Sequence, residues 1–284
     1  MAEVVEGPID LLANSIRYSV SNPKSIAIWG GIYLLTLILA FTCFIIGYFF
    51  LLGQDSLKDG GIPGLTIILA GLIPAVLGGI LVTGFICQCI RTLLSGESVT
   101  PIGLDNPWRL IKDGICVTII SFVGAIIGLI LMIPGFALMY YSSINKNDTL
   151  LLVGLVIFML SLIPYILLLF LSMIQWVIYV DSEHLSQGLN FLKSIGLILS
   201  HPLDAAIAII LVFVLQLVQS AICFVLEIPV CTMILFPFVA VLGYIATYYI
   251  FTRFYQKTTG NYDIKPPGSG EPDRPEGSNS PHML

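Results

Sequence analysis

A row of polar side chains inside an apolar stretch is the feature of this sequence best suited to chemistry. Its members recur at i, i+3, i+4, i+7 and i+11, so they share one face of a helix. They are Gln216, Gln219, Ser220, Cys223 and Glu227. Polar groups in hydrocarbon need partners, so this face should turn into a helix bundle or a wet cavity. It predicts either a solute or proton path with Glu227 at its outer mouth, or amides that bond neighbouring helices. We favour the second because Glu227 stands at the very end of the stretch.

Three prolines in similar positions predict a second structural feature of the apolar stretches. Pro74, Pro164 and Pro237 each follow two large apolar residues, and each precedes the first charge by sixteen or seventeen positions. A proline inside a helix removes a hydrogen bond and frees a carbonyl one turn back. We expect three helix kinks, which either fit helices to their neighbours or line a cavity, as broken helices do in transporters. We favour the first.

Motifs of the common enzyme classes are absent. The histidines are His184, His201 and His282, and there is no His-Glu-x-x-His, Gly-x-Ser-x-Gly or phosphate-binding glycine loop. No carboxylate pair lies within an apolar stretch. We therefore expect a protein that is not an enzyme and that needs no cofactor.

Cysteine use also favours packing over chemistry. The six cysteines lie in or beside apolar stretches, where a thiol packs as a small apolar group. Cys87, Cys89 and Cys116 could share the ends of two neighbouring helices, but they lack a fourth ligand and the usual zinc spacing. We expect no metal site.

Basic residues gather just outside the apolar stretches. Arg91, Arg109, Lys112 and Lys193 predict a modest cytoplasmic basic rim. Such a rim favours anionic lipid by about 1 kcal/mol per residue close to the membrane surface. It does not predict a nucleic-acid site.

Composition places all these residues in a membrane. Hydrophobic residues make up 57% of the chain and charged residues 10%, whereas soluble domains are about 25% charged. Six uncharged stretches exceed the ~18–20 residues that a helix needs to cross the hydrocarbon. They are Ile26–Leu52, Leu65–Ile90, Ile115–Tyr141, Leu150–Val180, Ala205–Leu226 and Pro229–Phe251. We predict an all-α integral membrane protein with six transmembrane helices.

The basic residues also predict its orientation. Of twelve, only Lys58 and Lys146 fall on one side of a six-span arrangement. Positive charge is retained in the cytoplasm, so both termini should be cytoplasmic in a multi-pass protein of the cell membrane.

Amphipathic segments before the first, third and fifth spans predict an internal repeat. These segments are Ile9–Ser21, Trp108–Asp113 and Leu185–Leu199, each with an apolar stripe at helical spacing. Each would lie at the cytoplasmic interface ahead of a transmembrane hairpin. The three repeats then cover about 9–91, 105–181 and 185–253 within a membrane domain of residues 1–255. Residues 256–284, rich in Pro, Gly and Ser, are expected to form a disordered cytoplasmic tail.

Small residues predict close helix contacts. Gly71, Ala75, Gly79 and Thr83 recur every fourth position, and Gly124 with Gly128 forms a GxxxG. Such stripes let helices approach closely, either within one chain or in a homo-oligomer. We favour packing within the chain.

The segment between the second and third spans resembles a known family. Pro101, Asp105, Trp108, Asp113 and Gly114 are similar to the linker of the domain of unknown function 4013 family. The resemblance implies a multi-span membrane protein of a mostly archaeal family with no established activity. The helix-plus-hairpin arrangement is also similar to the membrane domain attached to some glycerophosphodiester phosphodiesterases. No catalytic domain accompanies it here, so this similarity implies no enzyme activity.

Two classes of function remain. The first is a non-catalytic protein, a membrane scaffold or accessory subunit, which contacts lipids or a partner protein through its cytoplasmic helices or tail. The alternative is a small-solute or lipid transporter, or a channel-like protein, that uses the kinked spans and the Gln216–Glu227 face. The lack of charge within the spans favours the first, because ion-coupled transport usually needs buried ionisable groups.

Overall fold

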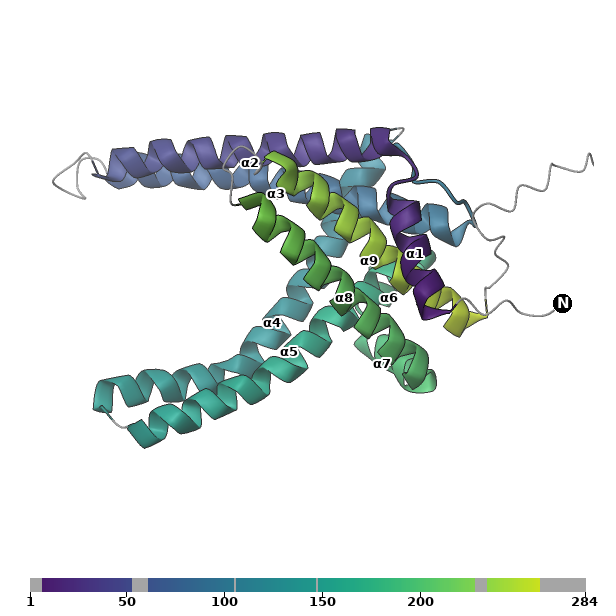
Figure 1. The fold of residues 1–284 in the computed structure, drawn as a ribbon. Helices are drawn as coiled ribbons and strands as arrows, with labels where there is room; N and C mark the ends of the chain where they lie inside the picture. The colour runs from purple at the N-terminus through teal and green to yellow at the C-terminus, as the bar shows by residue number, and fades with distance from the viewer. Residues whose placement is uncertain (1–6, 53–60, 105, 147, 228–233, 261–284) are drawn as a thin grey trace, which may run out of the picture.

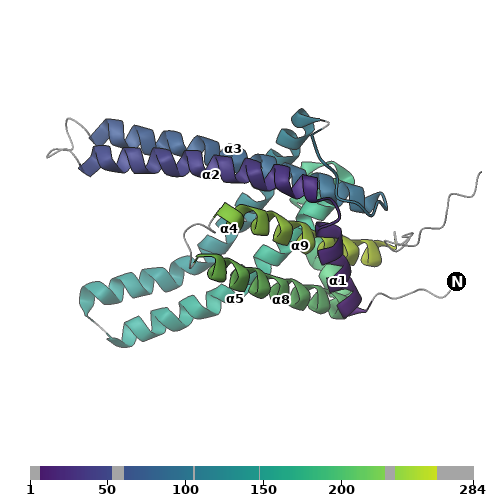
Figure 2. The ribbon, with the colours of Figure 1, turned by 45° about the horizontal axis from the view of Figure 1, so that its top comes forward.

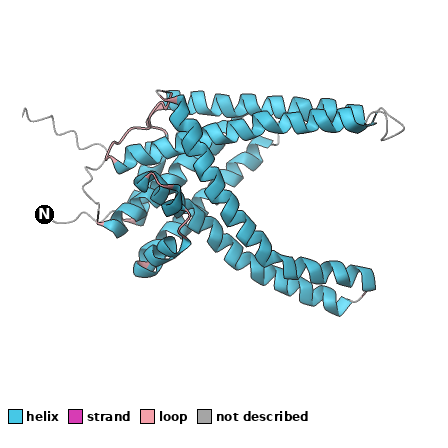
Figure 3. Ribbon diagram, turned by 180° about the vertical axis from the view of Figure 1, so that it is seen from behind, coloured by secondary structure: helices cyan, strands magenta, loops and turns pink. Residues whose placement is uncertain are grey.

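The computed structural model describes residues 7–52, 61–104, 106–146, 148–227 and 234–260, and these residues are almost entirely helical (Figures 1 and 3). No strand occurs among them. The helices are α1 (Pro8–Ser19), α2 (Pro23–Leu52), α3 (Gly61–Leu94), α4 (Pro107–Asn145), α5 (Asp148–Ser182), α6 (Leu185–Gly188), α7 (Phe191–Ser200), α8 (Pro202–Glu227) and α9 (Phe236–Thr259). Six of them, α2, α3, α4, α5, α8 and α9, are long and apolar enough to cross a membrane. The predictions of an all-α chain and of six candidate spans are confirmed.

Two long hairpins give the molecule its shape. The α2–α3 pair and the α4–α5 pair meet at one end and diverge toward their loops (Figures 1 and 2). Their far halves expose large apolar side chains, including Phe44 and Phe49 on α2 and Leu129 and Phe136 on α4. Lipid tails can cover such exposed apolar side chains. A helix also satisfies its own backbone hydrogen bonds, as any segment exposed to the hydrocarbon must.

Helix α9 forms the centre of the end where the hairpins meet. Within the most apolar 18 residues of α9, 78% are buried inside the protein, whereas the corresponding share in the other five spans ranges from 6% to 28%. The Tyr248 ring stacks on Trp176 of α5 with ring centres 4.7 Å apart. Gly30 of α2 leaves room for Phe238 of α9, because a Cβ there would overlap the phenyl ring. The core of the protein is therefore the set of side chains gathered around α9.

The α3–α4 linker, residues 95–106, is held against the start of α2. Ser25 Oγ donates to the Pro101 carbonyl at 2.7 Å, and Trp29 Nε1 donates to the Ile102 carbonyl at 2.8 Å. Trp29 is only 1% exposed, so its indole N–H needs this partner. These bonds fix where α4 begins relative to α2.

The interfacial helices differ from the sequence prediction in two places. The expected short helix Trp108–Asp113 is the beginning of α4 and is not a separate element. Asn106 caps it by accepting from Arg109 N at 3.1 Å, and no proline follows to stop the helix before the span. The predicted Leu185–Leu199 helix is divided into α6 and α7, because Asn190 caps a new start by accepting from Lys193 N. The threefold repeat stays a prediction.

Two of the three prolines that were expected to kink a helix lie inside one. Pro74 lies inside α3 and Pro164 inside α5, as predicted. Pro237 instead lies in the first turn of α9, where a helix needs no backbone N–H and the fixed φ of proline favours initiation. Pro134 inside α4 is a further helical proline that the repeat pattern did not single out.

Small residues pack the hairpins internally. A Cβ on Gly71 would overlap the Cys43 side chain of α2, and a Cβ on Gly128 would overlap the Tyr165 ring of α5. These two positions therefore serve contacts within the chain. Gly79 is open, with nothing within 4 Å of an added Cβ.

Helix α1 and the end of α9 lie at the same end of the molecule (Figure 1). Tyr18 of α1 is 5.4 Å from the Tyr249 ring of α9. Tyr18 donates to the Cys89 carbonyl, and burial raises the pKa of its hydroxyl well above the ordinary value, so the donor stays protonated. The tail was predicted to begin at residue 256, but α9 continues to Thr259, and Gln256 is buried and donates to the Leu93 carbonyl. The rest of the predicted tail, residues 261–284, lies outside the described residues.

Candidate functional site

A close crossing of α3 and α4 brings charged residues from separate spans together. A Cβ on Gly114 would overlap the Ile80 carbonyl, and a Cβ on Gly84 would overlap the Leu110 carbonyl. The two backbones therefore touch at paired glycines. Arg91, two turns beyond Gly84 on α3, then lies beside the first turns of α4.

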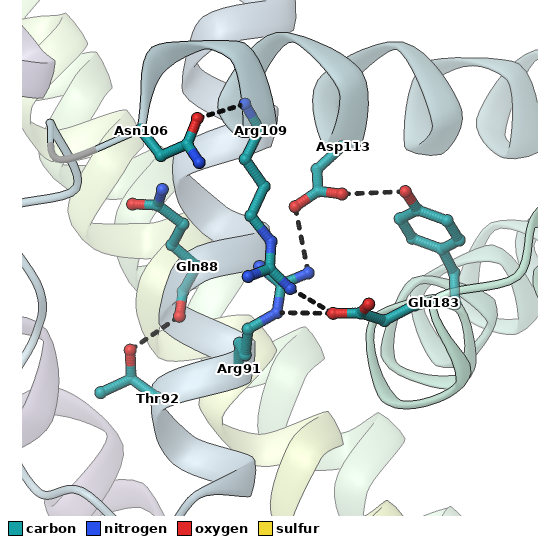
Figure 4. Close-up of polar contacts among 8 residues, drawn as sticks. Gln88, Arg91, Thr92, Asn106, Arg109, Asp113 and Glu183 are labelled. Atoms are coloured by element: carbon teal, nitrogen blue, oxygen red, sulfur yellow. Dashed lines mark hydrogen bonds and ion pairs between the residues drawn. The ribbon is translucent and has the colours of Figure 1, made fainter.

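Asp113 of α4 is the buried centre of the resulting network. Its side chain is 5% exposed. Oδ2 accepts from Arg91 at 3.1 Å, and Oδ1 accepts from the Tyr179 hydroxyl at 2.9 Å (Figure 4). A buried carboxylate needs such partners, because losing hydration without replacement costs several kcal/mol. This network joins α3, α4 and α5 at one point.

Glu183 closes the network from just beyond the end of α5. Its Oε1 lies 3.6 Å from Arg91 Nε and pairs with the Arg109 guanidinium, as Figure 4 shows. The Glu183 backbone has a φ of 56°, in the left-handed region, where the Cβ of any residue other than glycine meets steric strain. The Glu183 side chain is also 59% exposed. It is the loosest member of the network.

These residues surround what we call the charged cleft, with a volume of about 360 Å³, within the ~300–1,000 Å³ range of small-molecule pockets. Its lining is Arg91, Asn106, Trp108, Arg109, Lys112, Asp113, Tyr179 and Glu183. Lys112 is exposed and makes no ion pair within the described residues. Three basic and two acidic side chains leave the cleft with an excess of positive charge.

The structure brings together three of the four residues predicted for the basic rim. Arg91, Arg109 and Lys112 line the charged cleft, but Lys193 lies on α7 and does not. Sequence reasoning did not assign Tyr179 and Glu183 to a site. The available signal was that Asp181 and Glu183 follow an apolar stretch at the same membrane boundary as Arg91.

The predicted polar face of α8 lies partly against α9. Gln216 Nε2 donates to Thr247 Oγ1 of α9 at 3.3 Å. The Gln219 amide covers Gly243, although its Oε1 is buried without a hydrogen-bond partner among the described residues. Cys223 is buried, whereas Ser220 is exposed. Glu227 is the last residue of α8, and its side chain lies outside the described part of the chain.

Of the five cysteines that the structure describes, Cys87, Cys89 and Cys223 are buried, and Cys43 and Cys116 are partly exposed. Cys87 and Cys89 are at most 1% exposed within the core around α9. Within the described residues, no three His, Cys, Asp or Glu side chains come together as metal ligands.

Comparison with known proteins gives one match. A family of proteins described as of unknown function, DUF4013, matches residues 67–228, which is more than half of the chain. No curated protein and no solved structure gives a significant match. The matched range runs from α3 to just beyond α8 and includes every residue of the charged cleft. The chain therefore belongs to the DUF4013 family, and its six long apolar helices make it a multi-pass membrane protein of that family.

Proposed function

We propose that this protein is non-catalytic and acts at the cytoplasmic face of the cell membrane through contacts with lipids or with a partner protein. The charged cleft is the observation that carries the proposal, because it gathers Arg91, Arg109 and Lys112 where three spans end. Basic residues at that depth favour anionic headgroups by about 1 kcal/mol each. Trp108, 76% exposed beside them, is a residue type that favours the membrane interface.

The distribution of charge supports the orientation. Arg17, Lys24, Arg91, Arg109, Lys112, Lys193, Arg253 and Lys257 belong to α1, α7 or the ends of spans near these helices, whereas Lys146 stands at the α4–α5 turn. Retention of positive charge in the cytoplasm then assigns α1 and the end of α9 to that side.

The interfacial helices supply surfaces for such contacts. Leu192 and Leu199 of α7 are 81% and 72% exposed. Ser21-Asn22-Pro23 before α2 and Ser200-His201-Pro202 before α8 are matching breaks, which support descent of the first and last helix-plus-hairpin units from one repeat. In this proposal α1, α6 and α7 lie along the membrane surface, and a partner or the headgroups cover their apolar stripes.

The charged cleft has few groups free for catalysis. Asp113 is held by Arg91 and Tyr179, and no histidine is among the lining residues. General acid–base chemistry needs a group that can exchange a proton with a substrate. The lining supports recognition of charge instead.

Native mass spectrometry of the full chain, released gently from its own membrane, tests this proposal. We expect one stoichiometric lipid or one co-purifying protein. Leu192→Ser with Leu199→Ser should remove a protein bound along α7, while Leu203→Ser, at a leucine 74% exposed on α8, should leave it bound. Neither lipid nor protein at stoichiometric level would contradict the proposal.

The alternative is a transporter or channel-like protein. The unpartnered Gln219 Oε1 favours it, while the Gln216–Thr247 bond favours helix packing. The protein would be reconstituted into liposomes, and uptake of a panel of radiolabelled small solutes measured. A flux that Glu227→Gln abolishes, at unchanged membrane expression, would replace the contact proposal with transport.

A further inference from the structure

We infer that the charged cleft binds a phosphate group, and that Glu183 is an internal anion which the phosphate displaces. The inference rests on the proposed function and deepens it by naming the ligand chemistry. Phosphate is the shared chemistry of an anionic lipid headgroup and of a soluble phosphate compound.

The two guanidinium groups already hold one anion. Oε1 of Glu183 pairs with Arg109 and lies 3.6 Å from Arg91 Nε, so one carboxylate oxygen faces two arginines from different helices (Figure 4). Guanidinium groups match phosphate as they match carboxylate, through planar forks of N–H donors. A phosphate oxygen at the position of Oε1 would meet the same two cations.

The charged cleft has donor capacity that its own residues leave unused. Arg91 Nε is buried and makes no hydrogen bond, since 3.6 Å exceeds the range of one. Lys112 lines the cleft without an ion pair in the described part of the chain. Asp113 neutralises only one of the three cations once Glu183 has left. A phosphate therefore finds two positive charges in excess.

Glu183 is built to leave. Its side chain is 59% exposed, so water can receive the carboxylate, whereas the Asp113 side chain is 5% exposed and stays. Ion pairs of exposed side chains are weak, and a phosphate brings more oxygen acceptors than a carboxylate. Glu183 also stands between α5 and α6 with a left-handed backbone, so its movement does not break a helix.

The deciding measurement is an apparent dissociation constant for phosphatidylglycerol, obtained by native mass spectrometry of the full chain in detergent. Removing the internal anion in Glu183→Gln should tighten binding several-fold. Arg109→Gln should weaken it about tenfold, the loss of one charge-assisted hydrogen bond. Lys112→Gln should weaken it too, and this variant breaks no ion pair among the described residues.

Charge-matched control variants separate binding in the charged cleft from the overall electrostatic attraction between protein and lipid. Glu97→Gln and Arg17→Gln change the same charges at exposed positions outside the charged cleft. Both should bind phosphatidylglycerol as the wild type does. Thermal unfolding of each variant in the same detergent shows whether it is folded.

Inorganic phosphate identifies the source of the ligand. If millimolar phosphate displaces phosphatidylglycerol from the wild type and binds Glu183→Gln alone, the site takes soluble phosphates. If only the lipid binds, with phosphatidylcholine weaker, the site takes an anionic headgroup. Either result supports the inference.

Two results would overturn it. The first is that Glu183→Gln binds phosphatidylglycerol no more tightly than Glu97→Gln. The second is that Arg109→Gln and Lys112→Gln both bind it as tightly as Arg17→Gln. Either result would show that the charged cleft is not the phosphate site. If lipid still bound stoichiometrically in those variants, the broader contact function would stand. A wild type that bound neither lipid nor protein would overturn both.

Discussion

The two carboxylates of the charged cleft contribute unequally to the stability of the fold, because their exposure to water differs. Asp113 is nearly buried and bonded on both oxygens, while Glu183 reaches its arginines from water. Removing one partner of a buried pair leaves an uncompensated charge, whereas an exposed pair is worth little. The same network therefore combines a structural carboxylate with a replaceable one.

Asp113→Asn should lower the free energy of unfolding by about 3 kcal/mol, because Arg91 loses its buried counter-charge. Glu183→Gln should lower it by less than about 1 kcal/mol. Denaturant titration of both variants in detergent checks the difference. Equal losses of unfolding free energy would show that exposure does not decide how much each carboxylate stabilises the fold.

The left-handed backbone at Glu183 gives a second test. Glu183→Gly and Glu183→Ala both remove the carboxylate, but only glycine adopts positive φ without a steric penalty. The glycine variant should be about 1 kcal/mol more stable than the alanine variant. Unfolding midpoints measured side by side would contradict this if alanine were equal or better.

At the scale of elements, the glycine pair on α3 and α4 decides where the charged cleft forms. Gly84 and Gly114 let the two backbones touch, and the linker bonds of Ser25 and Trp29 fix the start of α4. Arg91 and Asp113 face each other as a result. The cleft is a product of helix crossing and not of any one local motif.

Gly114→Ala should destabilise the protein by about 1–3 kcal/mol, because the added methyl would overlap the Ile80 carbonyl and force the helices apart. Gly79→Ala is the matched control. Nothing lies within 4 Å of its added methyl, and alanine favours helix by up to about 1 kcal/mol. Thermal unfolding should move in opposite directions for the two variants.

Sequence alone predicts the elements better than their contacts. Each span is a local run of apolar residues, so its existence can be read without a partner. The meeting of Arg91, Asp113 and Glu183 depends on how three helices cross, and no local pattern encodes that angle. Pro237 was misassigned for a related reason: a proline after two large apolar residues lies inside a helix at Pro74 and Pro164 but in the first turn of one at Pro237. The local pattern does not tell where the helix begins.

At the scale of the whole molecule, orientation in the membrane follows from the separation of basic residues between the two ends. Arg17 of α1 is exposed at one end, and Lys146 is exposed at the α4–α5 turn. Positive charge is retained in the cytoplasm. The two positions should therefore lie on opposite sides of the membrane.

Cysteine labelling of intact cells checks that assignment. A membrane-impermeant maleimide should label Lys146→Cys in intact cells, and Arg17→Cys only after permeabilisation. Wild-type protein reports any labelling of its own six cysteines. The reverse pattern would invert the orientation and move the charged cleft to the outer face.

The central position of α9 has a consequence for biosynthesis. It follows the other five spans in the chain, so the ribosome delivers both long hairpins to the bilayer before the helix on which they converge. Until then Gly30 of α2 lacks its contact with Phe238, and Trp176 of α5 lacks its contact with Tyr248. Nascent chains that stall before Phe236 would hold inserted but unassembled hairpins, the kind of intermediate that membrane quality control removes.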